Sequence, residues 1–268
     1  LLLNFTVCGL IVVGGIGFPV LFDLTSWLAK HKTRRVRLSI HTKSVLLTTV
    51  MLIVTGALMF AFLEWQTLRQ HSSDTYCFLV PLFQSITCRT AGFNTVDIAG
   101  LTDATLALML FLMFFGASPG SCGGGVKTTT LALLTAFTLS RITRQRRVNM
   151  FKKSVPSETV SRSVSLVLVS TCLIGVILFM LLVGESAQSH QPSPPHDTFL
   201  AYAFETVSAF GTVGLSMGIT PELNTWGKLW ITLMMLIGRV GVLTFAYIIV
   251  GAGPTGGVEY SEENLMIG

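Results

Sequence analysis

The sequence predicts an all-α membrane protein built from repeated units of helix, short helix and helix. Three observations lead to this prediction. Hydrophobic residues make up 51% of the 268-residue chain and charged residues 12%, about half the charge of an ordinary soluble domain. Apolar stretches recur at lengths that cross a bilayer. One ungapped shift of 122 residues, which places Thr90 on Thr212, also aligns the C-terminal part of the chain with its middle.

The crossing helices come from the long apolar stretches, since a bilayer needs about 20 apolar residues per helix. Four stretches meet this length on their own: residues 1–24, 44–63, 164–184 and 229–250. A fifth, residues 104–139, is long enough if the glycine-rich segment 116–125 forms its middle. Two shorter runs, 78–87 and 199–210, predict helices that enter the membrane and turn back.

Charge predicts the orientation. Segments 30–43 and 141–163 hold six and seven basic residues, thirteen of the eighteen in the chain, so the positive-inside rule places both in the cytoplasm. Segments 64–76 and 185–197 carry almost no basic residue and face outward, and both short helices therefore dip in from outside. Nucleic-acid binding is not indicated, because the basic segments flank membrane spans and lack interleaved aromatic residues.

A TxG tetrapeptide follows each short helix. The shift of 122 residues also places Gly116 on Gly238. Potassium filters replace the water around the ion with backbone carbonyls, and TVG is the core of their signature. Glycine permits the backbone angles that such turns need, and the C-terminal dipole of the preceding helix favours a cation. Ordinary turns remain the alternative for a single TxG. The filter residues predicted here are Thr90, Ala91, Gly92, Phe93, Thr212, Val213, Gly214 and Leu215.

These repeats predict helix, re-entrant pore loop, helix units arranged pseudo-symmetrically around a cation pore. The stretch VGGIGF at residues 13–18 matches IGRVGV at 237–242, so the chain is expected to begin within an earlier repeat. The predicted order is a second crossing helix of an incomplete repeat (1–29), a basic cytoplasmic loop (30–43), a complete pore repeat with a broken second helix (44–140), a second basic loop (141–163), a second complete pore repeat (164–250) and a cytoplasmic tail (251–268).

The stretch GASPGSCGGGVKTTT begins at Gly116 and superficially resembles a phosphate-binding loop. Such a loop needs glycine where this chain has Ser121 and Val126, so a nucleotide site is not indicated. Each glycine inside a helix costs about 1 kcal/mol relative to alanine, and unwound backbone at membrane depth lines a cavity. A movable gate is predicted, with a static kink as the alternative. Its residues are Gly116, Ser118, Gly120, Ser121, Gly123, Gly124, Gly125, Lys127 and Arg239.

Arg239 stands out because it lies near the middle of an apolar helix, where a charge costs at least about 2.5 kcal/mol unless it meets a partner or water. It either faces the pore near the gate or is tied to loop carbonyls for stability. Lys127 either takes part in gating or extends toward the cytoplasmic surface. Glu205 is expected to be a hydrogen-bonded support, and Asp97 either attracts cations at the outer mouth or is a solvated loop residue.

The stretches SITCRTAGFNTVD, GASPGSCGGGVKTTT, SAFGTVGLSMGIT and IGRVGVLTF resemble the Ktr/Trk/HKT superfamily of cation transporters, and VGGIGFPV is typical of the second repeat of the bacterial Ktr membrane subunits. The resemblance implies potassium uptake through a multi-pass protein of the bacterial plasma membrane. It also implies a gate loop under the filter and an arginine facing the pore. Homodimers on cytosolic nucleotide-binding regulatory subunits of the RCK type, often with sodium dependence, are implied as partners.

Three rival functions remain. Sodium-passing members of the same superfamily differ in filter segments that precede this chain, so potassium and possible sodium transport are both open. A secondary transporter with broken helices would show inverted repeats, whereas the repeat found here keeps its orientation. Enzyme function and an organic cofactor are not expected, because the five cysteines and five histidines lack metal spacing and no catalytic group converges.

Overall fold

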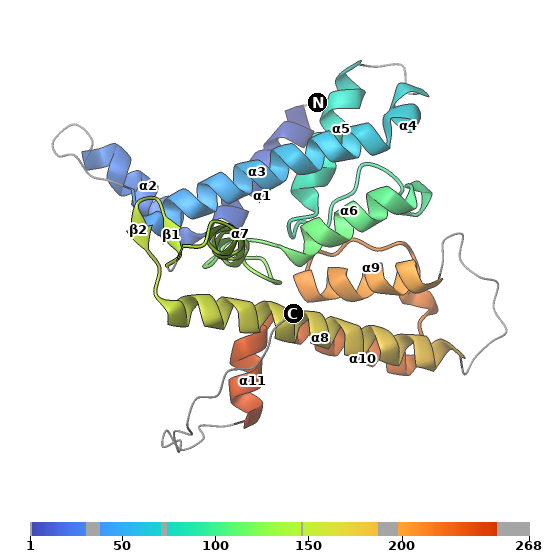
Figure 1. Ribbon diagram of the computed structural model, residues 1–268. Coiled ribbons are helices and arrows are strands. Elements are labelled where there is room, and N and C mark those ends of the chain that lie inside the picture. Colours follow the sequence, from blue (N-terminus) through green and yellow to red (C-terminus); the bar gives the residue numbers. More distant parts are fainter. Residues whose placement is uncertain (1, 31–37, 71–73, 146, 187–197, 251–268) are drawn as a thin grey trace.

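The computed structural model describes residues 2–30, 38–70, 74–145, 147–186 and 198–250. Two long helices, α3 (Ile40–Leu63) and α8 (Ser157–Ser186), lie on either side of the shorter helices α6 (Asp103–Phe114) and α9 (Thr198–Gly211) (Figure 1). Among the described residues, α3 and the Ser157–Gly184 part of α8 are the two unbroken helices that are long and apolar enough to cross a membrane.

The first complete repeat runs from α3 to α7. Ser39 caps α3 by accepting a hydrogen bond from the amide N of Thr42 at 3.1 Å. The repeat continues through α4 (Trp65–Gln70), α5 (Asp74–Thr87), a 3-10 turn at Ile98–Gly100, α6 and α7 (Thr128–Ile142). The last residues of α5 are buried, so this short helix ends inside the protein.

The second repeat has the same order. It contains α8, α9, a 3-10 turn at Thr220–Glu222, α10 (Thr225–Val240) and α11 (Val242–Val250). Both repeats join the start of one crossing helix to the end of another. The amide N of Thr102 donates to Glu64 Oε1 at 2.9 Å before α6, and Asn224 Nδ2 donates to the Gly184 carbonyl at 3.2 Å before α10.

Two predicted crossings differ from single helices. The first is split into α1 (Leu2–Ile16) and α2 (Phe18–Lys30), which meet at 98°. The last is split into α10 and α11 at Gly241. Gly17 and Gly241 have φ angles of +93° and +96°, which L side chains rarely adopt, so one glycine at each position ends the helix. Hydropathy does not register such a break because the apolar run continues through it.

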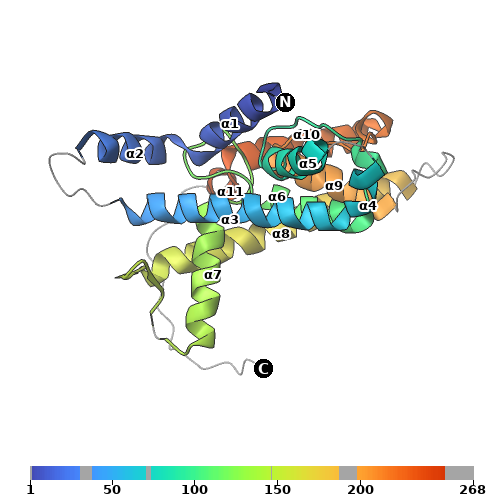
Figure 2. The ribbon, with the colours of Figure 1, turned by 90° about the horizontal axis from the view of Figure 1, so that it is seen from above.

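The break between α6 and α7 spans residues 115–127. Beyond it, α7 turns away from the other helices (Figure 2). A short hairpin follows, in which β1 (Asn149–Met150) pairs antiparallel with β2 (Lys153–Ser154). The sequence predicted a basic loop over 141–163 and no hairpin.

One large apolar core joins the two repeats. Met109 and Met113 of α6, Phe204 and Phe210 of α9 and Met234 of α10 are buried in it. The rings of Phe114 and Phe210 stack with centroids 5.9 Å apart. This packing holds the C-terminal ends of α6 and α9 together, which brings the segments that follow them to one place.

Candidate functional site: two TxG bends above a glycine-rich loop

The two TxG bends lie against each other. A Cβ atom on Gly92 would lie 2.7 Å from the carbonyl oxygen of Val213, and one on Gly214 would lie 3.4 Å from the Cα of Gly92. Thr90, Gly92, Thr212 and Gly214 all have positive φ angles, of 80°, 73°, 50° and 89°. Two segments 122 residues apart therefore adopt the same unusual backbone and meet at their glycines.

Each bend presents carbonyl groups that have no partner. Within the described ranges, the carbonyl oxygens of residues 90–92 and 212–214 accept no hydrogen bond. Backbone carbonyls in protein interiors are nearly always paired. Six unpaired oxygens in two adjacent bends are the arrangement that a dehydrated cation or ordered water can satisfy.

The fourth residue of each bend is held differently. Thr87 Oγ1 donates to the carbonyl of Phe93 at 2.6 Å and accepts from the amide N of Phe93 at 3.1 Å. In the second repeat, Ser208 Oγ donates to the carbonyl of Leu215, also at 2.6 Å. A hydroxyl near the end of each short helix thus fixes the end of its own bend. We call Thr87 and Ser208 the hydroxyl pins.

A second polar residue of each short helix reaches the segment after its bend. Glu205 is 5% exposed and accepts hydrogen bonds from Ser216 Oγ, from the amide N of Met217 at 3.2 Å and from Thr220 Oγ1 at 2.7 Å. In the first repeat the buried Gln84 donates from Nε2 to Thr95 Oγ1 at 3.5 Å. Glu205 is therefore placed as the hydrogen-bonded support that the sequence suggested.

The glycine-rich loop is closed at its base. The amide N of Val126 donates to the Phe114 carbonyl at 3.1 Å, and Phe115 and Val126 form a parallel bridge. Above this neck, the hydroxyls of Ser118 and Thr128 are 2.9 Å apart and both residues are buried. The loop leaves α6 and enters α7 through one narrow pair of strand-like residues.

The loop touches both bends from below. The amide N of Gly124 donates to Thr212 Oγ1 at 3.0 Å, and a Cβ on Gly123 would lie 2.6 Å from Thr90 Oγ1. A Cβ on Gly116 would lie 2.7 Å from the carbonyl of Gly124. Glycines are needed at these positions because the threonines that begin each bend leave no room for a side chain.

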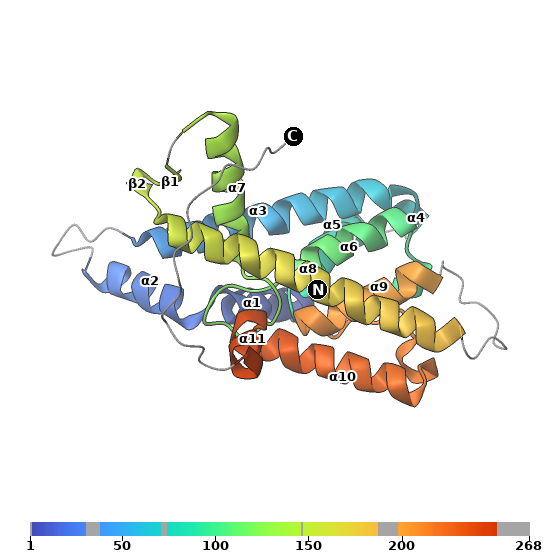
Figure 3. The same cartoon turned by 60° about the horizontal axis from the view of Figure 1, so that its bottom comes forward.

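Two helix breaks flank the same loop. On one side, the amide N of Phe18 donates to the Gly120 carbonyl at 3.1 Å, and the amide N of Ser118 donates to the Gly15 carbonyl at 3.0 Å. On the other side, Gly238 packs against the backbone of Phe210 and lies beside Gly124. Figure 3 shows this green segment beside α1 and the α10–α11 junction.

Both basic residues named with the gate bind carbonyls of the loop. Lys127 Nζ donates to the Gly123 carbonyl at 2.6 Å, and Arg239 Nη1 donates to the Cys122 carbonyl. Arg239 is exposed and Lys127 is half-buried in the chain. The arrangement brings two cationic side chains to one end of the loop, so the pore-facing and loop-tying interpretations of Arg239 describe the same position.

Other polar residues near the bends lie apart from this centre. Arg89 is buried, and its Nη2 donates to Thr49 Oγ1 of α3 at 3.4 Å, which links the end of α5 to α3. Asp97 is exposed and accepts from the amide N of Ala99 at 3.2 Å, which caps the 3-10 turn. Neither side chain has a printed contact with residues 90–92 or 212–214.

Sequence reasoning missed the hydroxyl pins. Residues 90 and 212 differ by 122, whereas Thr87 and Ser208 differ by 121, and so do Gln84 and Glu205. An ungapped shift of 122 places Ala209 opposite Thr87 and hides the correspondence. A search for polar residues near the ends of both short apolar helices, with a one-residue gap allowed, finds both pairs.

Comparison with known proteins agrees with this geometry. The family model described as TrkH, cation transport protein, matches residues 1–254. The chain belongs to the TrkH family of cation transport proteins. Among curated relatives, the Ktr system potassium uptake protein B of Vibrio alginolyticus is 37% identical over 269 residues, and the alignment covers 100% of this chain and 56% of that protein.

Other matches of this TrkH family member agree. The potassium/sodium uptake protein NtpJ of Enterococcus hirae is 34% identical, with 98% of this chain and 56% of that protein covered. The crystal structure of the potassium transporter TrkH from Vibrio parahaemolyticus matches with a TM-score of 0.70 at 21% identity, covering 94% of this chain and 52% of that one. It supports the all-α membrane fold. The chain spans about half the length of these relatives.

Proposed function

We propose that the chain supplies two filter segments and the gate of a potassium-uptake pore in the bacterial plasma membrane. The observation that carries the proposal is the pair of adjacent bends whose six carbonyl oxygens accept no hydrogen bond within the described ranges. Carbonyl oxygens of this kind replace the hydration shell of potassium in known filters. Residues 90–92 and 212–214 take this role, while the hydroxyl pins hold Phe93 and Leu215 in register.

The gate is assigned to the loop from Gly116 to Gly125, with Lys127 and Arg239 at one end of it. Gly123 and Gly124 meet the threonines that begin the two bends, so an ion leaving the bends toward the loop encounters backbone. The two cationic side chains lie farther along the same loop and raise the energy of a cation there. Opening requires the loop to move away from Thr90 and Thr212.

A sodium-passing pore is the second candidate. It is supported by the 34% identity to a relative named as a potassium/sodium uptake protein. Potassium and sodium are cargo in either case, and no organic cofactor is assigned to the chain. We further assign nucleotide-dependent regulation to separate cytosolic subunits of the RCK type on a homodimer, as the resemblance to Ktr systems suggests.

Ion flux through the full-length protein tests the function. The protein is reconstituted in liposomes, and the uptake of potassium and sodium is measured for the wild type, for Gly92→Ser and Gly214→Ser, and for Gly175→Ser as a control. Gly175 lies in α8, and a Cβ there would meet no atom within 4 Å. We expect both bend variants to lose potassium preference and the control to keep it. Equal selectivity in all four proteins contradicts the filter assignment.

A further inference from the structure

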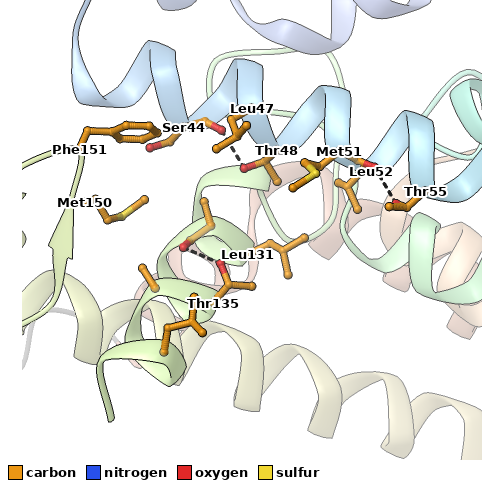
Figure 4. Close-up of a pocket in the computed structure, with 13 residues that line it drawn as sticks. Ser44, Leu47, Thr48, Met51, Leu52, Thr55, Leu131, Thr135, Met150 and Phe151 are labelled. Atoms are coloured by element: carbon orange, nitrogen blue, oxygen red, sulfur yellow. Dashed lines mark hydrogen bonds between the residues drawn. The ribbon is translucent and has the colours of Figure 1, made fainter. Parts of the chain in front are cut away.

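A groove of about 490 Å³ lies between α3, α7 and the β1–β2 hairpin, away from the bends and the loop (Figure 4). Its walls are apolar residues of α3 and α7, and Met150 and Phe151 of the hairpin close one end. Figure 4 shows Phe151 beside Ser44 at this end and Thr55 toward the other. The lining residues used below are Ser44, Leu47, Thr48, Thr55, Thr135 and Phe151.

The groove asks for hydrocarbon. Three of its hydroxyls are already paired with carbonyls of their own helices: Thr48 Oγ1 donates to Ser44 at 2.7 Å, Thr55 Oγ1 to Met51 at 2.6 Å and Thr135 Oγ1 to Ala132 at 2.9 Å. A polar ligand would have to replace these bonds, whereas an alkyl chain leaves them intact and covers apolar surface.

The dimensions fit one leaflet of a bilayer. Ser44 and Thr55 are eleven residues apart on α3, which corresponds to about 16 Å at 1.5 Å per residue. The hydrocarbon core of a bilayer is about 30 Å thick, so one leaflet is about 15 Å. The groove occupies the N-terminal half of α3, which the positive-inside rule places in the cytoplasmic leaflet.

The rim at the hairpin end is strongly basic. Lys43 precedes Ser44, and the exposed Lys152 and Lys153 follow Phe151 directly. A neighbouring cavity of about 340 Å³ on the other side of α7 is lined by Arg141 and Arg147. In the described part of the chain, the ion pair found near this region joins Glu158 to Arg162, so these five cations have no printed carboxylate partner.

The hairpin turn adds an independent observation. Phe151 and Lys152 have φ angles of +47° and +65°, in the left-handed region that L side chains seldom occupy. Backbone outliers of this kind persist where a function or the surroundings require them. Here the turn places the Phe151 ring on the mouth of the groove and leaves Lys152 exposed beside it.

We propose that this groove binds one acyl chain of an anionic phospholipid from the cytoplasmic leaflet, with the headgroup phosphate held by Lys43, Lys152 and Lys153. Charge complementarity and the match to leaflet length select this occupant over a second protein segment. Lipid bound here contacts both α3, which packs on the short helix α5, and α7, which continues from the glycine-rich loop. The composition of the membrane thereby reaches the elements around the bends.

Native mass spectrometry of the full-length protein in detergent tests the site. The protein is titrated with phosphatidylglycerol or with phosphatidylcholine of identical acyl chains. We expect selective retention of phosphatidylglycerol, a roughly 20-fold weakening in the double variant Lys152→Gln and Lys153→Gln, and loss of retention in Thr135→Trp, which fills the groove. Lys228→Gln and Leu168→Trp, both exposed positions elsewhere, are the matched controls and should bind as the wild type does.

Photo-crosslinking of the unmodified protein tests the same proposal without relying on variants that fold. Phosphatidylglycerol with a diazirine on its acyl chain should label residues 44–55 and 131–139 in preference to the exposed face of α8. Uniform labelling, or equal retention of the two lipids, overturns the proposal. So does a cysteine at Leu47 that cross-links in native membranes to a second copy or to another segment of the same chain, because protein would then fill the groove.

Discussion

The amide N of Gly124 lies 3.0 Å from Thr212 Oγ1 and donates a hydrogen bond to it. This bond joins the middle of the glycine-rich loop to the first residue of a TxG bend. The corresponding threonine, Thr90, meets Gly123 by packing: its Oγ1 would lie 2.6 Å from a Cβ there. The loop is therefore fixed to one bend by a directional bond and to the other by shape.

Removing that bond should favour the open gate. Thr212→Val keeps the shape of the side chain and deletes the acceptor. A hydrogen bond of this kind contributes about 1 kcal/mol, so we expect the basal potassium flux of reconstituted full-length protein to rise about fivefold. Thr90→Val is the matched control, because Thr90 has no printed hydrogen bond to the loop, and its flux should change less. Equal fluxes in both variants would show that the Gly124 bond does not hold the loop.

The two bend glycines should differ in their tolerance of alanine. A Cβ on Gly92 would lie 2.7 Å from the Val213 carbonyl, whereas a Cβ on Gly214 would meet its nearest atom at an ordinary 3.4 Å. Both substitutions carry the cost of a left-handed backbone, about 1 to 2 kcal/mol, and Gly92→Ala also displaces a carbonyl of the neighbouring bend. We expect the potassium-to-sodium flux ratio to fall further in Gly92→Ala than in Gly214→Ala. The reverse order would contradict the contact between the bends.

The hydroxyl pins should matter for selectivity more than for folding. Thr87→Val or Ser208→Ala leaves the carbonyl of Phe93 or Leu215 without its donor, at a cost of about 1 to 3 kcal/mol for an unpaired buried group. The freed end of the bend should relax and admit sodium. Thr206→Val is the control, because Thr206 Oγ1 donates to the Tyr202 carbonyl within α9 and touches neither bend. Flux ratios for the three variants test this, and a loss in Thr206→Val alone would sink the pin assignment.

Much of the architecture was predictable because hydrophobic length and charge asymmetry are written along the sequence. The family, the helical membrane fold and the two short apolar helices all follow from those signals. The 98° break at Gly17 did not, because a single left-handed glycine leaves the apolar run intact. The pins were hidden for a related reason: α9 places one more residue between pin and bend than α5 does, and an ungapped comparison cannot register it.

The loop contacts also lay beyond sequence reasoning. Glycine density at residues 116–125 indicated unwound backbone, but it could not tell which glycines are excluded from having side chains by contact. In the structure Gly123 and Gly124 meet threonines of both bends, while Gly120 meets the ring of Pro19. These contacts depend on the folding of three distant segments onto one another, and local composition carries no information about that.

Glu64 should make stability depend on pH. It lies just beyond the end of α3, and burial raises its pKa, but hydrogen bonds from Thr102, Thr105 and Thr67 outweigh burial and hold the pKa below its ordinary value. A carboxyl whose pKa is lowered by folding stabilises the native state above its unfolded pKa and loses that contribution as the pH falls through the folded value. We therefore expect Glu64→Gln to lower the melting temperature of the full-length protein at pH 7 and to have a shrinking effect below about pH 4. Glu222→Gln, at an exposed position, is the control, and a difference that stays constant from pH 7 to pH 3 would mean that the Glu64 carboxylate does not carry the effect.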